Sequence, residues 1–281
     1  MRASAAHART APASTAGDEL ALSCRGIERS FGGLRALKGV DLDVARGEIF
    51  GLVGPNGSGK TTMVNVMTGF YPPNAGRVRL FGQDITGVAP HRIARMGVAR
   101  TFQNLALFKG MSVLDNILLG RHVHMRPSAL AALFYWAWAE REELAHRRLV
   151  EEVIDFMQLQ DIRDEPVEVI PMGLQKRVEL ARALVAEPRL LILDEPMAGM
   201  NQEEKEYIAR FILDAREERG VTIFIIEHHM DVVTAICDRA MVLSYGETIA
   251  EGEPKAAIAE PKVIEAYIGQ RAAARHARAQ T

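Results

Sequence analysis

A glycine-rich octapeptide, Gly54-Pro-Asn-Gly-Ser-Gly-Lys-Thr61, constrains the fold of this chain more than any other segment. It matches the pattern G-x-x-x-x-G-K-[ST] in full, and it lies between a short apolar segment at 48–53 and a helical pattern at 61–68. Glycines let the backbone curl so that successive N–H groups point at a polyphosphate, and the following helix adds its positive end. The octapeptide therefore predicts a strand–loop–helix unit that binds a nucleotide through its phosphates.

Two side chains of this loop have chemistry of their own. Lys60 supplies a positive charge to the β- and γ-phosphates of a nucleoside triphosphate. The hydroxyl of Thr61 is a hard oxygen ligand and can hold Mg²⁺.

A second apolar run ends in two carboxylates, in the segment Leu190-Leu-Ile-Leu-Asp-Glu-Pro196. The carboxyl ends of strands are where open α/β sheets bind their ligands. Asp194 is suited to hold Mg²⁺, directly or through water, and Glu195 is then free to polarise an attacking water as general base. An Asp-Glu pair alone is a weak signal, but downstream of a phosphate loop it indicates hydrolysis of the bound nucleotide.

Strand-like and helix-like segments alternate along most of the chain, which predicts a layered α/β fold. Between about residues 112 and 171 no segment has the pattern of a strand, and apolar residues recur at helical spacing. We therefore expect an inserted helical subdomain over about 111–174. The strands expected are 20–27, 37–44, 48–53, 77–80, 190–193 and 221–226, and the helices expected elsewhere are 61–68 and 203–219.

Composition excludes several classes of protein. The formal net charge of −2 argues against a strongly basic nucleic-acid binder, and 48% hydrophobic residues argue against disorder. No apolar run reaches the ~18 residues that span a bilayer. Cys24 and Cys237 lack zinc-ligand spacing, so we expect two reduced thiols, with a single disulfide between them as the alternative. Residues 1–19 are expected to be a disordered leader, with a transit peptide as the alternative, and 270–281 a mobile tail.

The order of these motifs resembles the ATP-binding subunit of ABC transporters over about residues 20–269. The resemblance implies a P-loop NTPase core with a parallel sheet, an antiparallel β edge and an inserted helical subdomain. It makes Asp194 and Glu195 the Walker B acid and the catalytic glutamate. It assigns the nucleotide to the Walker A loop, whose residues are Gly54, Pro55, Asn56, Gly57, Ser58, Gly59, Lys60, Thr61 and Thr62.

The same resemblance implies roles for residues outside the two Walker motifs. Phe31 stacks on adenine, Gln103 senses the γ-phosphate and the metal, and His228 is the switch histidine. Ala198-Gly-Met-Asn201 is the D-loop. Lys60, Gln103, Glu195 and His228 thus form the catalytic set, and Thr61, Gln103 and Asp194 are the Mg²⁺ ligands.

The signature segment, LSGGQ in the family, is replaced here by Ile170-Pro-Met-Gly-Leu174. Pro171 takes the serine's place and offers neither a hydroxyl nor an N–H. Gly173 keeps the backbone donor, ahead of a helix expected to begin near Leu174. In the family this segment meets the γ-phosphate of ATP bound to the opposite subunit, so both residues are assigned to the nucleotide in trans.

His228 is followed by His229, which raises the alternative of a metal-binding pair. Adjacent residues at the end of a strand point in opposite directions, and no third ligand is evident nearby. We therefore do not expect a metal at these two histidines.

One subfamily resembles the chain further, the LivG-type subunits of branched-chain amino-acid importers. The shared segments are Ala99-Arg-Thr-Phe-Gln-Asn104, Glu195-Pro-Met-Ala-Gly-Met-Asn201, Ile226-Glu-His-His-Met-Asp231 and Val263-Ile-Glu-Ala-Tyr-Ile-Gly269. The subfamily also carries a helical insert in the place of residues 122–148. The aromatic segment 130–139 within it either packs on its own subdomain or contacts the membrane subunit or the bilayer interface.

The resemblance implies an ATPase at the cytoplasmic face of the membrane that powers amino-acid uptake. Its implied cofactors are ATP and Mg²⁺. Its implied partners are a second ATPase subunit, identical or related, two membrane-embedded permease subunits and, indirectly, an extracytoplasmic solute-binding protein. Alternatives are an importer for urea or amides, a soluble ABC ATPase of DNA repair or translation, a non-hydrolysing regulatory subunit and a small-molecule kinase. No nucleic-acid partner is expected.

Overall fold

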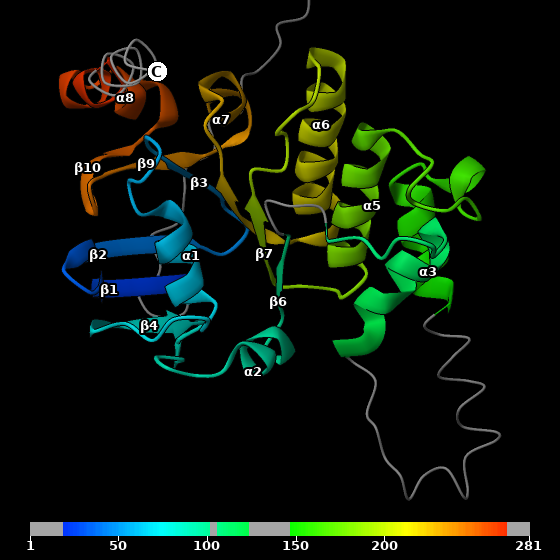
Figure 1. Cartoon of the computed structure of the whole chain (residues 1–281), viewed down its shortest axis with the longest axis horizontal. Coiled ribbons are helices and arrows are strands. Elements are labelled where there is room, and N and C mark those ends of the chain that lie inside the picture. The colour runs from blue at the N-terminus through cyan, green and yellow to red at the C-terminus, as the bar shows by residue number, and fades with distance from the viewer. Residues whose placement is uncertain (1–18, 102–105, 124–146, 269–281) are drawn as a thin grey trace, which may run out of the picture.

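The computed structural model describes residues 19–101, 106–123 and 147–268, and Figure 1 shows their arrangement. A central sheet of six strands has the order β10-β9-β3-β8-β7-β6. The five strands from β9 to β6 run parallel, and β10 pairs antiparallel to β9. These strands are β3 Ile49–Val53, β6 Val98–Arg100, β7 Leu190–Asp194, β8 Thr222–Ile226, β9 Arg239–Ser244 and β10 Glu247–Gly252.

Every residue of β3, β7 and β8 is buried, as the unbroken apolar runs in their sequences require. The side chains of these strands alternate between two cores. One core includes α5 and α6, and the other includes α1 and the second sheet. The strands therefore lie between layers, with their carboxyl ends free to carry the loops of the candidate site.

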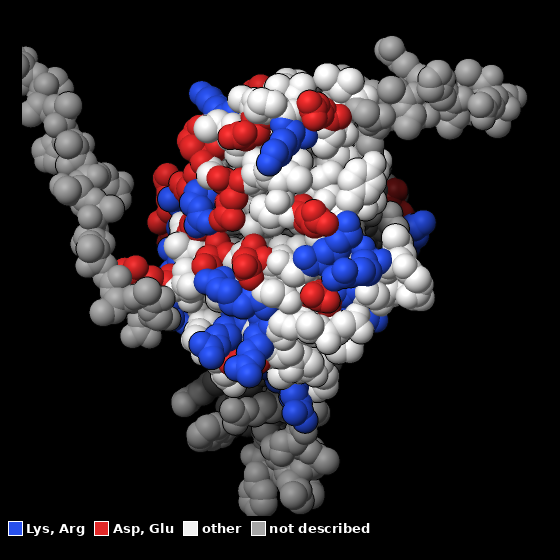
Figure 2. All heavy atoms as spheres, turned by 90° about the vertical axis from the view of Figure 1, so that its left-hand side faces the viewer, with Lys and Arg blue, Asp and Glu red and all other residues white. Residues whose placement is uncertain are grey.

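The second sheet is antiparallel, with four strands in the order β2-β1-β4-β5. It lies in the lower part of the left-hand side of Figure 1, and on that side basic side chains gather in the lower half among acidic ones, as Figure 2 shows. Exposed ion pairs such as Arg25–Asp43 and Lys38–Glu247 stabilise a protein by less than about 1 kcal/mol each, so the buried face holds this sheet. The strands are β1 Leu20–Phe31, β2 Leu34–Ala45, β4 Ala75–Leu80 and β5 Gln83–Asp84.

The helices lie on both sides of the central sheet, and α3, α5 and α6 gather at the right of Figure 1. Residues 147–156 and 261–268 are also helical. The named elements are α1 Lys60–Met67, α2 Pro90–Arg95, α3 Val113–Leu118, η1 Leu119–Val123, η3 Gln160–Ile162, α5 Met172–Leu184, α6 Gln202–Arg219, α7 Met230–Ile236 and α8 Pro254–Ala259.

The predicted fold class is confirmed, and each strand and helix expected from the sequence has a counterpart within a few residues. Within the described part of 112–171 there is no strand, only an isolated bridge between Ser112 and Pro166. The strands β5, β6, β9 and β10 were not predicted. No helix in the described part of the chain is both long and apolar enough to cross a membrane.

Five predictions fall wholly or mostly on residues outside the described ranges. These are the leader at 1–19, the role of Gln103, the helical insert at 122–148, the aromatic segment at 130–139 and the tail at 270–281. Glu19 is described, and its carbonyl accepts a hydrogen bond from the Arg46 N–H at 2.8 Å. Glu19 is therefore tied to the end of β2.

Candidate functional site

The glycine-rich loop connects the carboxyl end of β3 to the start of α1, as predicted. Its first and last glycines cannot be replaced without moving the backbone. A Cβ atom on Gly54, whose φ is 151°, would lie 2.1 Å from the carbonyl oxygen of Leu243. One on Gly59, whose φ is 110°, would lie 2.7 Å from the carbonyl oxygen of Ala36. Packing against β9 and β2 therefore fixes the curl of the loop.

Lys60 and Ser58 place polar groups inside this loop, and within the described residues the protein satisfies the Lys60 ammonium only in part and the Ser58 hydroxyl not at all. The buried Lys60 Nζ donates to the carbonyl oxygens of Gly54 and Pro55, at 2.7 and 3.0 Å. Burial lowers the pKa of Lys60, although the charges of Glu195 and Asp194 oppose that shift. The Ser58 Oγ is buried and has no hydrogen-bond partner within the described part of the chain. Phosphate oxygens would supply the acceptors that these groups lack, so the loop fits a nucleotide.

Asp194, at the end of β7, is paired with a cation that the sequence did not reveal. The Arg100 guanidinium donates to Asp194 at 2.9 Å, and the two side chains are only 9% and 4% exposed. Arg100 also donates to the Asn65 side chain at 2.7 Å. Asp194 and the Thr61 hydroxyl are oxygen donors of the kind that Mg²⁺ prefers, so their chemistry fits this ion.

Glu195 and His228 follow the adjacent strands β7 and β8, and the structure brings them together. The His228 Nδ1 lies 3.9 Å from the Glu195 Oε2. The Glu195 N–H donates to the Ile226 carbonyl oxygen at 3.0 Å, which ties the two loops at their origin. Glu195 adopts a φ of 50°, which is uncommon for a residue with a side chain. Such backbone strain is frequent at functional sites.

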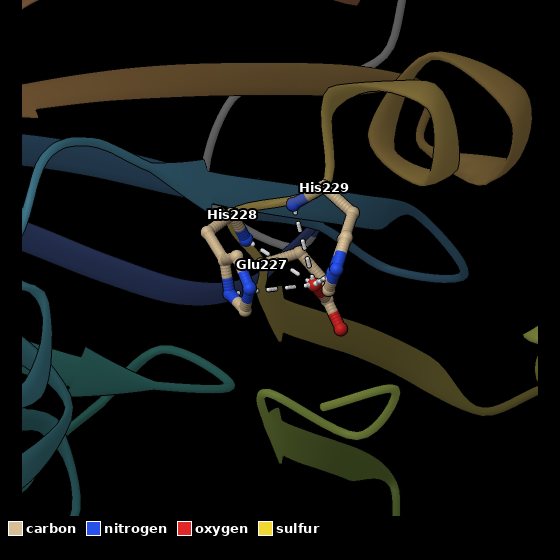
Figure 3. Close-up of side chains that lie close together, drawn as sticks. All are labelled: Glu227, His228 and His229. Atoms are coloured by element: carbon tan, nitrogen blue, oxygen red, sulfur yellow. Dashed lines mark hydrogen bonds and ion pairs between the residues drawn. The ribbon is translucent and has the colours of Figure 1, made fainter. Parts of the chain in front are cut away.

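The prediction that His228 and His229 point in opposite directions is wrong. Their ring centroids lie 4.0 Å apart, and both rings face the Glu227 carboxylate, as Figure 3 shows. The strand rule does not apply because β8 ends at Ile226, and His229 is already the N-cap of α7. A third potential ligand is also present, since Glu227, His228 and His229 bring ligand atoms within 4.8 Å of one another.

Phe31 lies at the end of β1 with 39% of its surface exposed, so its ring is free to meet a planar ligand. Tyr71, which the sequence analysis did not single out, contacts it edge-on at 5.2 Å between centroids. The Arg29 guanidinium lies 4.7 Å from the Phe31 centroid and 5.4 Å from that of Tyr71. This aromatic pair could stack a base. Gln103, by contrast, lies outside the described residues.

The signature segment leads into α5, which begins at Met172, two residues before Leu174, near which the helix was predicted to begin. Pro171 is the N-cap, and its side chain caps no N–H. A Cβ atom on Gly173 would lie 2.4 Å from the Glu204 Oε1. In the described part of the chain, no hydrogen bond or ion pair joins Pro171 or Gly173 to the loop 54–61. Within one chain, therefore, the structure does not bring this segment into the group around Lys60.

Known proteins of one family are similar to this chain in sequence. Residues 37–198 match the family described as ABC transporter. The high-affinity branched-chain amino acid transport ATP-binding protein BraF of Pseudomonas aeruginosa is 39% identical over 249 residues, covering 89% of this chain and 98% of that protein. The corresponding LivG protein of Escherichia coli is 36% identical over 249 residues, with the same two coverages of 89% and 98%.

A solved structure is similar over the same length. It is the ADP conformation of MJ1267, an ATP-binding cassette of an ABC transporter. It superposes with a TM-score of 0.78 at 36% sequence identity, covering 89% of this chain and 99% of that chain.

Proposed function

Because this chain belongs to the ABC transporter family, we propose that it is the ATP-hydrolysing subunit of an importer for branched-chain amino acids. The chain is an ATPase of that family, and the relatives that it matches over nearly their whole length are named as transport ATP-binding proteins. The observation that supports the proposal most is that Glu195 and His228 lie close together, near the loop 54–61, which fits phosphate groups.

Each residue of the site then has a role in hydrolysis. Lys60 leaves the carbonyl oxygens of its own loop and binds the β- and γ-phosphates, and Phe31 stacks on the base. Glu195 accepts a proton from the attacking water, and His228 stabilises charge on the γ-phosphoryl group. We assign Mg²⁺ to Thr61, Gln103 and Asp194; when bound, it neutralises phosphate charge during transfer.

A second ATPase subunit completes the site in this proposal. Among the described residues, Pro171 and Gly173 form no hydrogen bond or ion pair with the loop 54–61 of their own chain, which is expected if they face ATP on an opposite subunit. The positive end of the thirteen-residue helix α5 would then meet the γ-phosphate. ATP would hold the two subunits closed and hydrolysis would release them, so the γ-phosphate acts as a switch.

We further propose that one permease subunit binds at a hollow of about 330 Å³ beside α5 on each ATPase subunit, which makes two in the complete transporter. It is lined by residues of β6, η1 and α5, and by Phe108, of which 57% is exposed. Phe108 lies three residues after the segment 102–105, which includes Gln103. This adjacency would couple the site to the membrane, at whose cytoplasmic face the chain would act, with a solute-binding protein on the other side.

Co-purification tests the proposal. The tagged chain, extracted in detergent with its native membranes, should retain a polytopic membrane protein. Phe108→Asp should weaken that retention without lowering the ATPase rate of the isolated chain. Tyr207→Asp, a change at another exposed aromatic residue, is the matched control and should have no effect. If the tagged chain hydrolyses ATP but retains no membrane protein from the detergent extract, the result would instead favour a soluble ABC ATPase.

A further inference from the structure

Glu227, the residue between β8 and His228, is fully buried, and its carboxylate receives donors from two loops (Figure 3). One oxygen, Oε1, accepts the Met197 N–H at 3.2 Å, in the segment that follows Glu195. The other, Oε2, accepts the N–H groups of His228 and His229 at 3.2 and 3.5 Å. The same Oε2 lies 2.9 Å from the His229 Nδ1. Each oxygen of the carboxylate thus accepts hydrogen bonds from a different loop.

Stability alone does not explain a carboxylate at this position. A buried charge is costly unless it is paired and hydrogen-bonded, and an apolar side chain of similar volume is often as stabilising. In the described ranges no lysine or arginine forms an ion pair with Glu227. Its charge is balanced by three backbone N–H groups and one imidazole. An ionised carboxylate only accepts, so the His229 Nδ1 carries the proton in this contact.

The residues held by Glu227 flank the two groups assigned to hydrolysis. Met197 lies two residues after Glu195, and the bonded N–H of His228 belongs to the switch histidine itself. The Glu195 N–H bond to Ile226 and the Met197 N–H bond to Glu227 fasten the two loops at successive points. The His228 Nδ1 and the Glu195 Oε2, 3.9 Å apart, lie on the two loops that these bonds join.

We propose that Glu227 is a positioning residue for ATP hydrolysis, which sets the His228 ring against Glu195 by bonding the backbones of both loops. This inference rests on the roles proposed above for Glu195 and His228. A metal is a weaker reading of the same cluster. An ion at the Glu227 Oε2 would have to displace the donors that already occupy it.

A double-mutant cycle on the full chain tests the proposal. Glu227→Gln keeps the volume but turns one acceptor into a donor, which then faces an N–H. We expect kcat for ATP to fall about tenfold, with KM for ATP changed less than about twofold. If Glu227 acts through His228, the same substitution should lower kcat less than about twofold in a His228→Ala background. Glu227→Asp, which keeps the charge, should restore part of kcat.

Glu48→Gln is the matched control, because Glu48 is also a buried glutamate that accepts a backbone N–H, from Ala45, but at the opposite end of β3. It should lower the melting temperature without changing kcat. If Glu227→Gln leaves kcat unchanged while His228→Ala lowers it, Glu227 positions nothing. Equal losses in both backgrounds would also overturn the proposal. A His228→Ala variant with normal kcat would overturn the role of His228 and this inference with it.

Discussion

Pro171→Ser puts a hydroxyl where the ABC transporter signature has one. The backbone of Pro171, with φ −55° and ψ 152°, is a conformation that serine adopts without strain. As the N-cap of α5, the new hydroxyl can accept from the N–H of Gly173 or Leu174, which stabilises proteins by about 1 kcal/mol. The loss of the proline ring costs about 0.4–1 kcal/mol through the unfolded chain. The melting temperature should therefore change by only a few degrees.

The effect on activity should be larger, because the hydroxyl can also donate to the γ-phosphate on the opposite subunit. One charge-assisted hydrogen bond contributes about 1.5–3 kcal/mol. That corresponds to roughly 10- to 100-fold in ATP-driven closure. In the arrangement proposed here the signature acts in trans, so the wild-type chain should hydrolyse ATP slowly as a homodimer. We expect it to work best with a different subunit that carries a fuller signature.

Steady-state ATPase rates at several protein concentrations provide the assay. Pro171→Ser should exceed wild type, whereas Pro171→Ala, which removes the ring but adds no hydroxyl, should stay close to it. Gly173→Asp is the negative control, since it places a carboxylate against Glu204 and toward the opposite phosphate. If Pro171→Ser is no faster than wild type, the remaining donors suffice and the reasoning about the missing hydroxyl is refuted.

Three further predictions concern single groups. Lys60→Ala should weaken ATP binding at least about tenfold in calorimetric titration, because the phosphates lose their point charge, and a smaller change would contradict the assignment of the loop. Arg100→Met leaves Asp194 buried and uncompensated, which costs about 3–5 kcal/mol and should lower the melting temperature by on the order of 10 °C; an unchanged melting curve would show that the pair is not stabilising. Burial raises the pKa of the Cys237 thiol to about 12 and raises that of Cys24 further, so neither should react with a thiol reagent near pH 8 until the protein is unfolded, and rapid labelling of the native chain would disagree.

The core strands could be predicted because each is an unbroken run of apolar residues, which indicates a buried strand without reference to the rest of the chain. β3, β7 and β8 are short apolar runs next to motifs whose chemistry is local. β10 was missed because it is an edge strand of mostly half-exposed or exposed residues. The sequence did hold a signal for it, because Gly246 lies between the segments that form β9 and β10, and a glycine between two strand-like segments indicates a hairpin. In the structure Tyr245 and Gly246 both adopt positive φ, as a two-residue hairpin turn requires.

The candidate site also contains residues that could be predicted from the sequence and residues that could not. The loop 54–61 and the pair Asp194-Glu195 follow from residue types at fixed spacing, so the sequence sufficed. Arg100 lies 94 residues before its partner Asp194, and nothing in a single sequence pairs them. The orientation of His228 and His229 was predicted wrongly because the strand was assumed to continue past Ile226, where a buried carboxylate instead turns the backbone.

Hydrolysis by Glu195→Gln is the most direct test of the central claim, that Glu195 is the general base of an ATPase. Purified wild type and variant are compared in ATP binding and in single-turnover release of phosphate, with the exposed Glu203→Gln as control. The variant should bind ATP within about twofold of wild type and lose about 10²- to 10⁴-fold in hydrolysis, since an amide cannot accept the proton from water. Glu203→Gln should behave as wild type. Near-normal phosphate release by Glu195→Gln would contradict the account.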